Sequence, residues 1–322
     1  MRESTKSWLF ASVALISVGS ILFTVTGCAI NWDFKKFSTI DMETNTHTIG
    51  EDFNNITMDT DTTDIILRPS ENGECKVVCY EDAKQNHSVR VENGTLTIQE
   101  QDERVWHDYI NIGYSGSPTI TVYLPKTQYA DLSIETHTGD ITIMNNFLFN
   151  SVDISGSTCD VTCSTAVATT LSIDISTGDI TLNETTADTV SLTVSTGDID
   201  LNKVAVTNDL TIQSSTGKTE LEHVTSKNYT HNSTSGDVEM ENVFIFGKMQ
   251  IETSSGDVEF EHCDAGEIYI KTSTGDVAGS LLTAKDFHAN TSTGKVKVPS
   301  SSEGGKCEIN TSTGDIEITV VS

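Results

Sequence analysis

Apolar and polar residues alternate with a period of two over most of the second half of the chain, which is the pattern of strands with one buried face. The alternation comes in pairs of short runs that meet at a Ser/Thr-Gly-Asp phrase. Around Gly197 the apolar positions are Val190, Leu192, Val194, Ile199 and Leu201. A further inward column is predicted seven residues past the corner, at Val204, Val224, Val243, Cys263 and Leu282. Each unit therefore predicts two strands joined at a corner, where glycine permits the positive φ of a tight turn.

The corner phrase recurs at a nearly constant interval of 19 or 20 residues. Its central positions are Gly139, Cys159, Gly178, Gly197, Gly217, Gly236, Gly256, Gly275, Gly294 and Gly314. A fixed short period is typical of a solenoid, in which each coil buries its apolar face only against its neighbours. The sequence therefore predicts an all-β, single-chain β-solenoid of about ten coils, preceded by one N-terminal transmembrane or signal helix.

The segment before the regular repeats is also rich in strands. Within residues 31–135, Asp59–Ile65 resembles a repeat without its glycine, and Asn93-Gly94 is typical of a two-residue hairpin turn. Solenoid ends expose unpaired strand edges that need covering. We therefore interpret residues 31–135 as an N-terminal cap with irregular first coils, between a membrane segment at 1–30 and the regular solenoid at 136–322.

The N-terminal segment carries no charge between Trp8 and Thr26. A helix of that length spans roughly 28 Å, close to the ~30 Å hydrocarbon core of a bilayer, which favours an uncleaved transmembrane helix. The alternative is a lipoprotein signal, because Val25-Thr26-Gly27-Cys28 has the small-small-Cys form that would make Cys28 the lipidated N-terminus. Both predict a location at the bacterial cell membrane, with the body outside the cytoplasm.

Charge limits the partners of the body. The formal net charge is -28, and all of the excess acid lies beyond residue 30. Such a surface repels nucleic acid and anionic lipid, and it favours cations or basic partners. We therefore expect no nucleic-acid ligand, and we expect membrane contact only through the N-terminal segment.

The residue after the corner is acidic in most coils, and stacking would place these carboxylates about 5 Å apart. They are Asp140, Asp160, Asp179, Asp198, Asp237, Asp257, Asp276 and Asp315. Adjacent carboxylates at that spacing repel by ~0.8 kcal/mol in water, so calcium between coils is one hypothesis. The alternative is that each Asp bonds its own turn, with Lys218 and Lys295 interrupting the column. No other cofactor or metal is expected.

No catalytic arrangement is recognisable. Cys75 and Cys79 lie about 13 Å apart along a predicted strand, too far for a disulfide or a metal pair. The eight His residues form no HxxxH or HExxH array, and His231 falls in an inward column rather than beside another ligand. Polysaccharide lyases and hydrolases on β-helices are the enzyme alternative, but the repeats between 166 and 300 admit no long insertion that could build a cleft. We therefore predict that the chain is not an enzyme.

Four features together resemble a known family. They are an N-terminal anchor followed by Trp32-Asp33-Phe34, the segment Thr60–Ile65, the segment Ile120–Pro125 and the serial Ser-Thr-Gly-Asp phrases. Over residues 32–322 this combination resembles the bacterial putative-adhesin family of β-strand repeats. The resemblance implies a non-catalytic cell-surface module that binds a surface glycan or protein. The alternative is an extracytoplasmic sensor or scaffold that works with a membrane partner.

Overall fold

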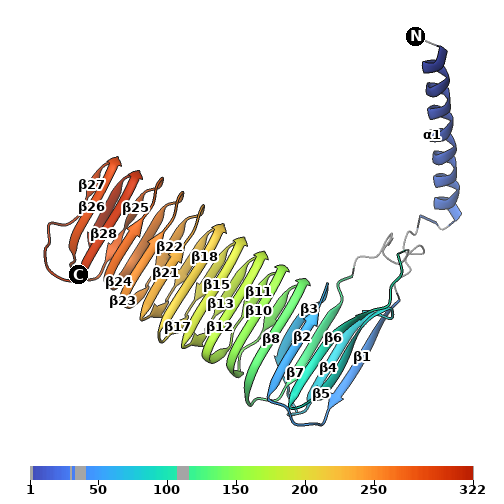
Figure 1. Ribbon diagram of the computed structural model, residues 1–322, viewed down its shortest axis with the longest axis horizontal. Helices are drawn as coiled ribbons and strands as arrows, with labels where there is room; N and C mark the ends of the chain where they lie inside the picture. Colours follow the sequence, from blue (N-terminus) through green and yellow to red (C-terminus); the bar gives the residue numbers. More distant parts are fainter. Residues whose placement is uncertain (1–2, 30, 33–40, 107–115, 322) are drawn as a thin grey trace.

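The computed structural model describes residues 3–29, 31–32, 41–106 and 116–321. The body is an elongated stack of β-coils, and one helix, α1 (Glu3–Ala29), lies at the N-terminal end of the chain (Figure 1). The predicted all-β solenoid with a single N-terminal helix is confirmed.

The strands before the regular coils are β1 (Met42–Ile49), β2 (Asn55–Thr60), β3 (Asp64–Pro69), β4 (Cys75–Asp82), β5 (Gln85–Glu92), β6 (Thr95–Asp102) and β7 (Thr119–Leu124). The strands of the coils are β8 (Gln128–Thr138), β9 (Ile141–Ile143), β10 (Leu148–Thr158), β11 (Val161–Cys163), β12 (Ala166–Thr177), β13 (Ile180–Asn183), β14 (Thr186–Ala187), β15 (Thr189–Thr196), β16 (Ile199–Asn202), β17 (Ala205–Val206), β18 (Asp209–Thr216), β19 (Thr219–Glu222), β20 (Thr225–Ser226), β21 (Asn228–Asn232), β22 (Val238–Glu241), β23 (Phe244–Glu252), β24 (Val258–Lys271), β25 (Val277–Leu281), β26 (Asp286–Thr293), β27 (Val296–Lys297), β28 (Lys306–Thr313) and β29 (Ile316–Val320).

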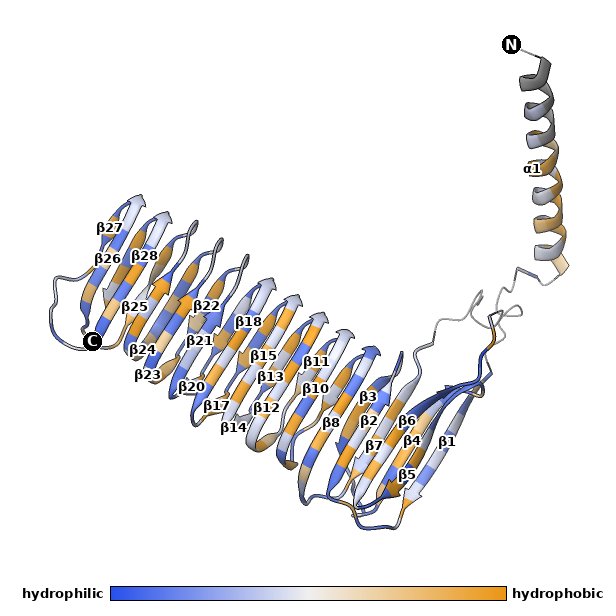
Figure 2. Cartoon of the chain, in the orientation of Figure 1, coloured by the Kyte–Doolittle hydropathy of each residue, from blue (hydrophilic) through white to orange (hydrophobic). Residues whose placement is uncertain are grey.

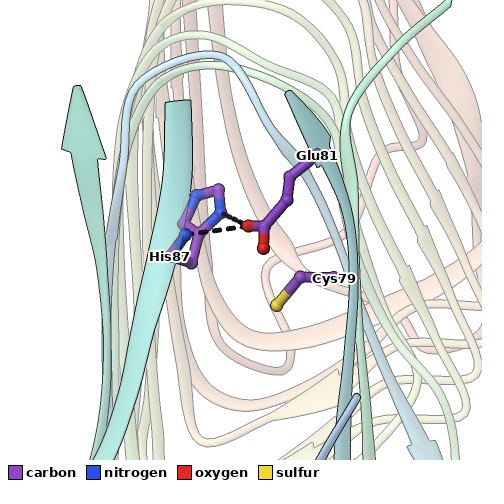
Figure 3. A group of neighbouring side chains, drawn as sticks. All are labelled: Cys79, Glu81 and His87. Carbon is purple, nitrogen blue, oxygen red and sulfur yellow. Dashed lines mark hydrogen bonds and ion pairs between the residues drawn. The ribbon is translucent and has the colours of Figure 1, made fainter. Parts of the chain in front are cut away.

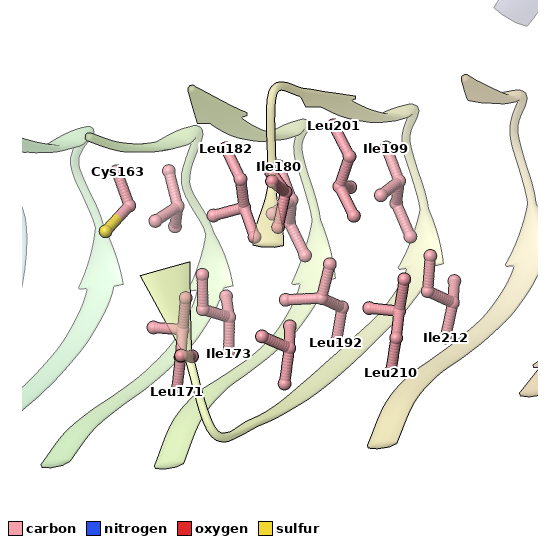
Figure 4. Close-up of a cluster of buried hydrophobic side chains, with 14 of the residues drawn as sticks. Cys163, Leu171, Ile173, Ile180, Leu182, Leu192, Ile199, Leu201, Leu210 and Ile212 are labelled. Carbon is pink, nitrogen blue, oxygen red and sulfur yellow. The ribbon is translucent and has the colours of Figure 1, made fainter. Parts of the chain in front are cut away.

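Each regular coil places its two main strands in two facing layers. The strand before the corner, such as β12 or β15, pairs in parallel with its counterpart in the next coil, so that Ile173 lies opposite Leu192. The strand after the corner does the same in the other layer, where Ile180 lies opposite Ile199. Their apolar side chains meet between the layers (Figure 4). Hydrophobic and polar residues therefore alternate along the strands (Figure 2), and the predicted inward columns are confirmed.

One inward position differs from the prediction. The column seven residues past the corner was expected to contain Leu282, but this side chain is 38% exposed. The pairing of β24 with β25 shifts register after Phe260, and Leu281 then lies opposite Cys263. Leu281 therefore takes the buried position, and the prediction for Leu282 is wrong.

Glycine at the corner is required for two reasons. Gly197 has a φ of 146°, in the region that favours glycine. An added Cβ there would also lie 1.9 Å from the carbonyl oxygen of Gly178 in the preceding coil. Cys159, which occupies one corner, is buried, and its Sγ lies 2.4 Å from where a Cβ on Gly156 would stand. A glycine three residues earlier therefore makes room for the cysteine at this corner.

The last coils do not stack in chain order. β28 pairs with β24 on one side and with β26 on the other. β29 likewise lies between β25 and β27. Residues 306–320, which we call the inserted coil, therefore lie between two coils that precede them in the sequence. Residues 286–297 form the far end of the rod, which the repeat spacing did not indicate.

The N-terminal end stops the stack by a change of pairing. β2 and β3 pair in parallel with β8 and β9, and the corner between them lacks a glycine. β6 and β7 add one more parallel strand to each layer. Beyond them β5, β4 and β1 pair antiparallel with β6, β7 and β4, respectively. The expected hairpin turn joins β5 to β6, with Asn93 and Gly94 both at positive φ.

Candidate functional site

The eight predicted aspartates do form one exposed column along the glycine corner. In each, Oδ1 accepts a hydrogen bond from the main-chain N–H of the equivalent residue in the next coil. Asp179 Oδ1 lies 2.8 Å from the nitrogen of Asp198, and the other distances are 2.7–3.1 Å. The acceptors are Asp140, Asp160, Asp179, Asp198, Asp237, Asp257, Asp276 and Asp315. Asp64, which sequence analysis missed, does the same for Asp140 at 3.0 Å.

These bonds run between coils. The expectation that each Asp would satisfy its own turn is therefore wrong, because the carboxylate reaches the main chain of its neighbour instead. A carboxylate is a strong acceptor for an N–H donor, so these hydrogen bonds link consecutive corners on the solvent side of the rod. Calcium binding at this column stays a prediction.

Six glutamates stand in two rows of three on the layer of strands that follow the corner, and we call them the glutamate face. They are Glu220, Glu222, Glu239, Glu241, Glu259 and Glu261. The register of β19, β22 and β24 places the members of each row side by side, about 4.8 Å apart. They line an open groove of about 530 Å³, which ends at Ala278, Gly279 and Ser280.

The negative charges of the glutamate face lie close enough together to change the pKa values of neighbouring groups. Lys218 forms ion pairs with Glu220 and with Glu239, the second at 2.8 Å, and hydrogen bonds to these carboxylates raise the pKa of Lys218. Burial and then the charges of Glu220 and Asp198 raise the pKa of Asp200, at the edge of the rows.

Sequence analysis missed the two rows of glutamates because it compared only inward positions. Their signal is Glu at the third and fifth positions after the corner in three successive coils.

A buried polar cluster lies between the two layers at the N-terminal end of the rod (Figure 3). It comprises Cys79 and Glu81 on β4 and His87 on β5, which are 0%, 1% and 4% exposed. One donor atom from each residue lies within 4.8 Å of the other two. We call these three residues the cap cluster.

Hydrogen bonds hold the cap cluster together. Glu81 Oε2 accepts from His87 Nδ1 at 2.7 Å and from the His87 main-chain nitrogen at 2.8 Å. Glu81 Oε1 accepts from Asn45 Nδ2 at 2.8 Å. The second ring nitrogen, His87 Nε2, lies 3.5 Å from Thr63 Oγ1 and 3.7 Å from Glu100 Oε2. Five segments of the chain thus converge on one small site.

The protonation of the cap cluster follows from these contacts. Burial raises the pKa of the Cys79 thiol to about 12, and the charge of Glu81 adds to the shift. Burial acts to raise the pKa of Glu81 as well, but hydrogen bonds from His87 and Asn45 outweigh it, and the pKa lies below its ordinary value. At neutral pH the site therefore contains a thiol next to a carboxylate.

Sequence analysis missed this cluster, since it compared Cys79 only with Cys75 and searched for His residues only along the chain. Two local signals place the residues together. Cys79 and Glu81 are two apart on one strand and so share a face. The turn after Asp82 then brings His87 across to them.

Comparison with known proteins identifies the family. The family model described as Toastrack DUF4097 matches residues 53–242 and again residues 203–322. The chain belongs to the Toastrack family. No curated protein sequence matches the Toastrack chain. The resemblance to the putative-adhesin family of β-strand repeats is confirmed.

Solved structures resemble the Toastrack chain at low sequence identity. A structure named as a putative adhesin from Parabacteroides merdae is 14% identical, with 74% of this chain and 96% of that chain covered, and the TM-score is 0.53. A structure named as a putative adhesin from Parabacteroides distasonis is 12% identical, with 87% and 98% covered and a TM-score of 0.47. The first likeness shows the β-solenoid fold alone.

α1 of the Toastrack chain contains the stretch Ser12–Ala29, which is long and apolar enough to cross a membrane by length and composition. A signal sequence near an N-terminus passes the same test. Cys28 is exposed in the last turn of α1 and is not in a disulfide. Lipidation of Cys28 stays a prediction, as does the choice between a spanning helix and a lipid anchor.

Proposed function

We propose that this Toastrack protein is a non-catalytic binding rod of the bacterial envelope, held at the membrane by α1 with its body outside the cytoplasm. The observation that carries the proposal is the in-register stacking of the coils, which turns single outward residues into regular rows along a flat face. A rigid array of equivalent groups suits multivalent attachment, in which many weak contacts act together.

The glutamate face is the part of the rod that we propose as the contact surface. It gathers six carboxylates on three consecutive coils, and Lys218 pairs with two of them at one end. A patch of one sign attracts ligands of the other sign and raises their rate of encounter. The ligand that fits is a surface protein or glycan bearing several amino or guanidinium groups.

Binding to a polycation tests this function. The full chain in detergent micelles is passed over immobilised polylysine and over an uncharged polymer, in a series of salt concentrations. We expect polylysine binding that weakens with salt, and a loss of about fivefold or more in E220Q/E239Q/E259Q. The control E135Q/D153N/D174N removes three exposed acids from the opposite layer.

The two variants carry the same net charge, so net charge alone cannot separate them. Equal losses in both would overturn the glutamate face as the contact surface. Binding that is equal on polylysine and on the uncharged polymer would overturn a cationic ligand altogether.

A further inference from the structure

The cap cluster lies outside the proposed contact surface, and it combines the three donor types that zinc prefers. A thiol sulfur, a carboxylate oxygen and an imidazole nitrogen lie within 4.8 Å of one another in a buried site. Zinc bound tetrahedrally at 2.0–2.3 Å needs its donors roughly 3.4–3.8 Å apart. Small side-chain adjustments of Cys79, Glu81 and His87 reach that spacing.

We propose that the cap cluster is a zinc site in which Cys79 Sγ, a Glu81 carboxylate oxygen and His87 Nδ1 bind one divalent ion. The proposal is independent of the binding function of the rod. Three protein ligands leave a fourth position for water or another small ligand, as in zinc sites with an open coordination position.

The contacts around the three ligands match those of a metal centre. A metal-bound His commonly donates its other ring N–H to a carboxylate or another acceptor, which fixes the orientation of the ring. His87 Nε2 faces Glu100 Oε2 at 3.7 Å and Thr63 Oγ1 at 3.5 Å. Glu81 in turn is held through Oε1 by Asn45. These outer partners are the second observation that points to a metal.

The charge balance also suits a buried site. Zinc carries two positive charges, and the Cys79 thiolate and the Glu81 carboxylate carry one negative charge each, so the occupied site is neutral. A neutral centre avoids the large cost of burying an uncompensated charge. In the metal-free state His87 Nδ1–H donates to Glu81. On binding, Nδ1 gives its lone pair to zinc and the ring proton moves to Nε2.

Zinc binding must release the thiol proton of Cys79 to solvent. While the pH lies below the pKa of the thiol, the affinity for zinc therefore rises about tenfold for each unit by which the pH increases.

The ion can enter past β1, which pairs with β4 and with no other described strand. Asn45 of β1 lies opposite Cys79 in that pairing, directly over the site. Local opening of this edge strand therefore exposes the three ligands.

Cobalt substitution tests the zinc site. The full chain in detergent micelles, stripped with a chelator and kept reduced, is titrated with Co²⁺. We expect a thiolate-to-cobalt charge-transfer band with the intense visible bands of tetrahedral cobalt, both removed by Zn²⁺. C79S and H87N should lose the thiolate band or the tetrahedral signature. C75S is the matched control, because Cys75 is buried on the same face of the same strand.

X-ray absorption at the zinc edge provides a measurement that needs no variant. One sulfur together with nitrogen and oxygen neighbours is expected for the unmodified chain. The proposal is overturned by the absence of a thiolate band in the unmodified chain, by a band that survives in a folded C79S chain, or by an absorption spectrum without sulfur.

Discussion

His231 is a buried polar side chain in the interior of the regular coils. It lies on β21 between Ile212 and Ile251, is 1% exposed, and neither ring nitrogen has a hydrogen-bond partner among the described residues. The ring of Tyr229 packs beside it at 6.3 Å between centroids. Burial lowers the pKa of His231 to about 4. This residue therefore stays neutral in the fold at pH values where an unfolded chain would protonate it.

Acid should weaken the rod through His231. Between pH 6.5 and about 4, His231 is protonated in the unfolded chain but stays neutral in the folded chain. The free energy of unfolding therefore decreases as the pH falls through this range, by about 3 kcal/mol in total. We expect H231L to melt higher than the unmodified chain, with the difference growing from pH 7.5 to pH 5. Thermal melts at several pH values measure this. H137N, at an exposed His, is the control, and parallel melting curves for H231L and the unmodified chain would refute the account.

The corner is the element that repeats most faithfully, and its parts have separate tasks. Glycine permits the approach of the neighbouring main chain, while the aspartate that follows it bonds the next coil. Each corner is thus joined to its neighbour by two features that the sequence repeats together. At the other end of the short strand the main chain turns with positive φ at Glu184, Lys203 and His223, none of them a glycine.

Removal of one carboxylate from the column should weaken the link between two coils. In D179A the N–H of Asp198 loses its acceptor at an exposed position, and we expect a loss of about 1 kcal/mol in the free energy of unfolding. D179N keeps an oxygen acceptor and should lie close to the unmodified chain. Urea unfolding compares the three.

The same unfolding experiments in a chelator and in calcium test the cation hypothesis. A stabilisation by calcium that is smaller in D179N would support a bound cation in the column. An identical response in all three chains would leave the aspartates with the hydrogen-bonding role alone. D179N as unstable as D179A would contradict that role.

The elements that could be predicted are those fixed by local patterns. Alternation identified the inward columns, including His231, because a strand residue points to one face or the other. The cap cluster and the inserted coil could not be predicted in this way. His87 on β5 and Cys79 on β4 belong to different layers, so they meet only because the chain crosses from one layer to the other between these two strands. The coil phrases at Gly294 and Gly314 are equally compatible with either order of stacking.

At the scale of the whole molecule, the far end of the rod depends on the inserted coil. β26 and β27 find their strand partners only in β28 and β29 among the described residues. The end coil, residues 286–297, therefore has no direct strand pairing with the rest of the rod. Stability in a solenoid passes from neighbour to neighbour, so loss of the inserted coil should release the end coil too.

Truncation measures this dependence. A chain that stops after residue 302 lacks the inserted coil but retains the end coil. We expect its melting temperature to equal that of a chain that stops after residue 281, because residues 282–302 then contribute no stacked coil. Limited proteolysis of the longer variant should cut within residues 286–297. Protection of that segment, or a clearly higher melting temperature than the shorter variant, would contradict the expectation.

The inserted coil also sets the timing of assembly. Synthesis delivers a chain from its N-terminus, and most of the stack can form as each coil emerges. The coil at 286–297 emerges before the residues that must lie beneath it, so it has no finished surface on which to settle. The tip of the rod therefore closes only after residues 306–320 have been made, and a chain whose translation stops before them carries an open, unfinished tip.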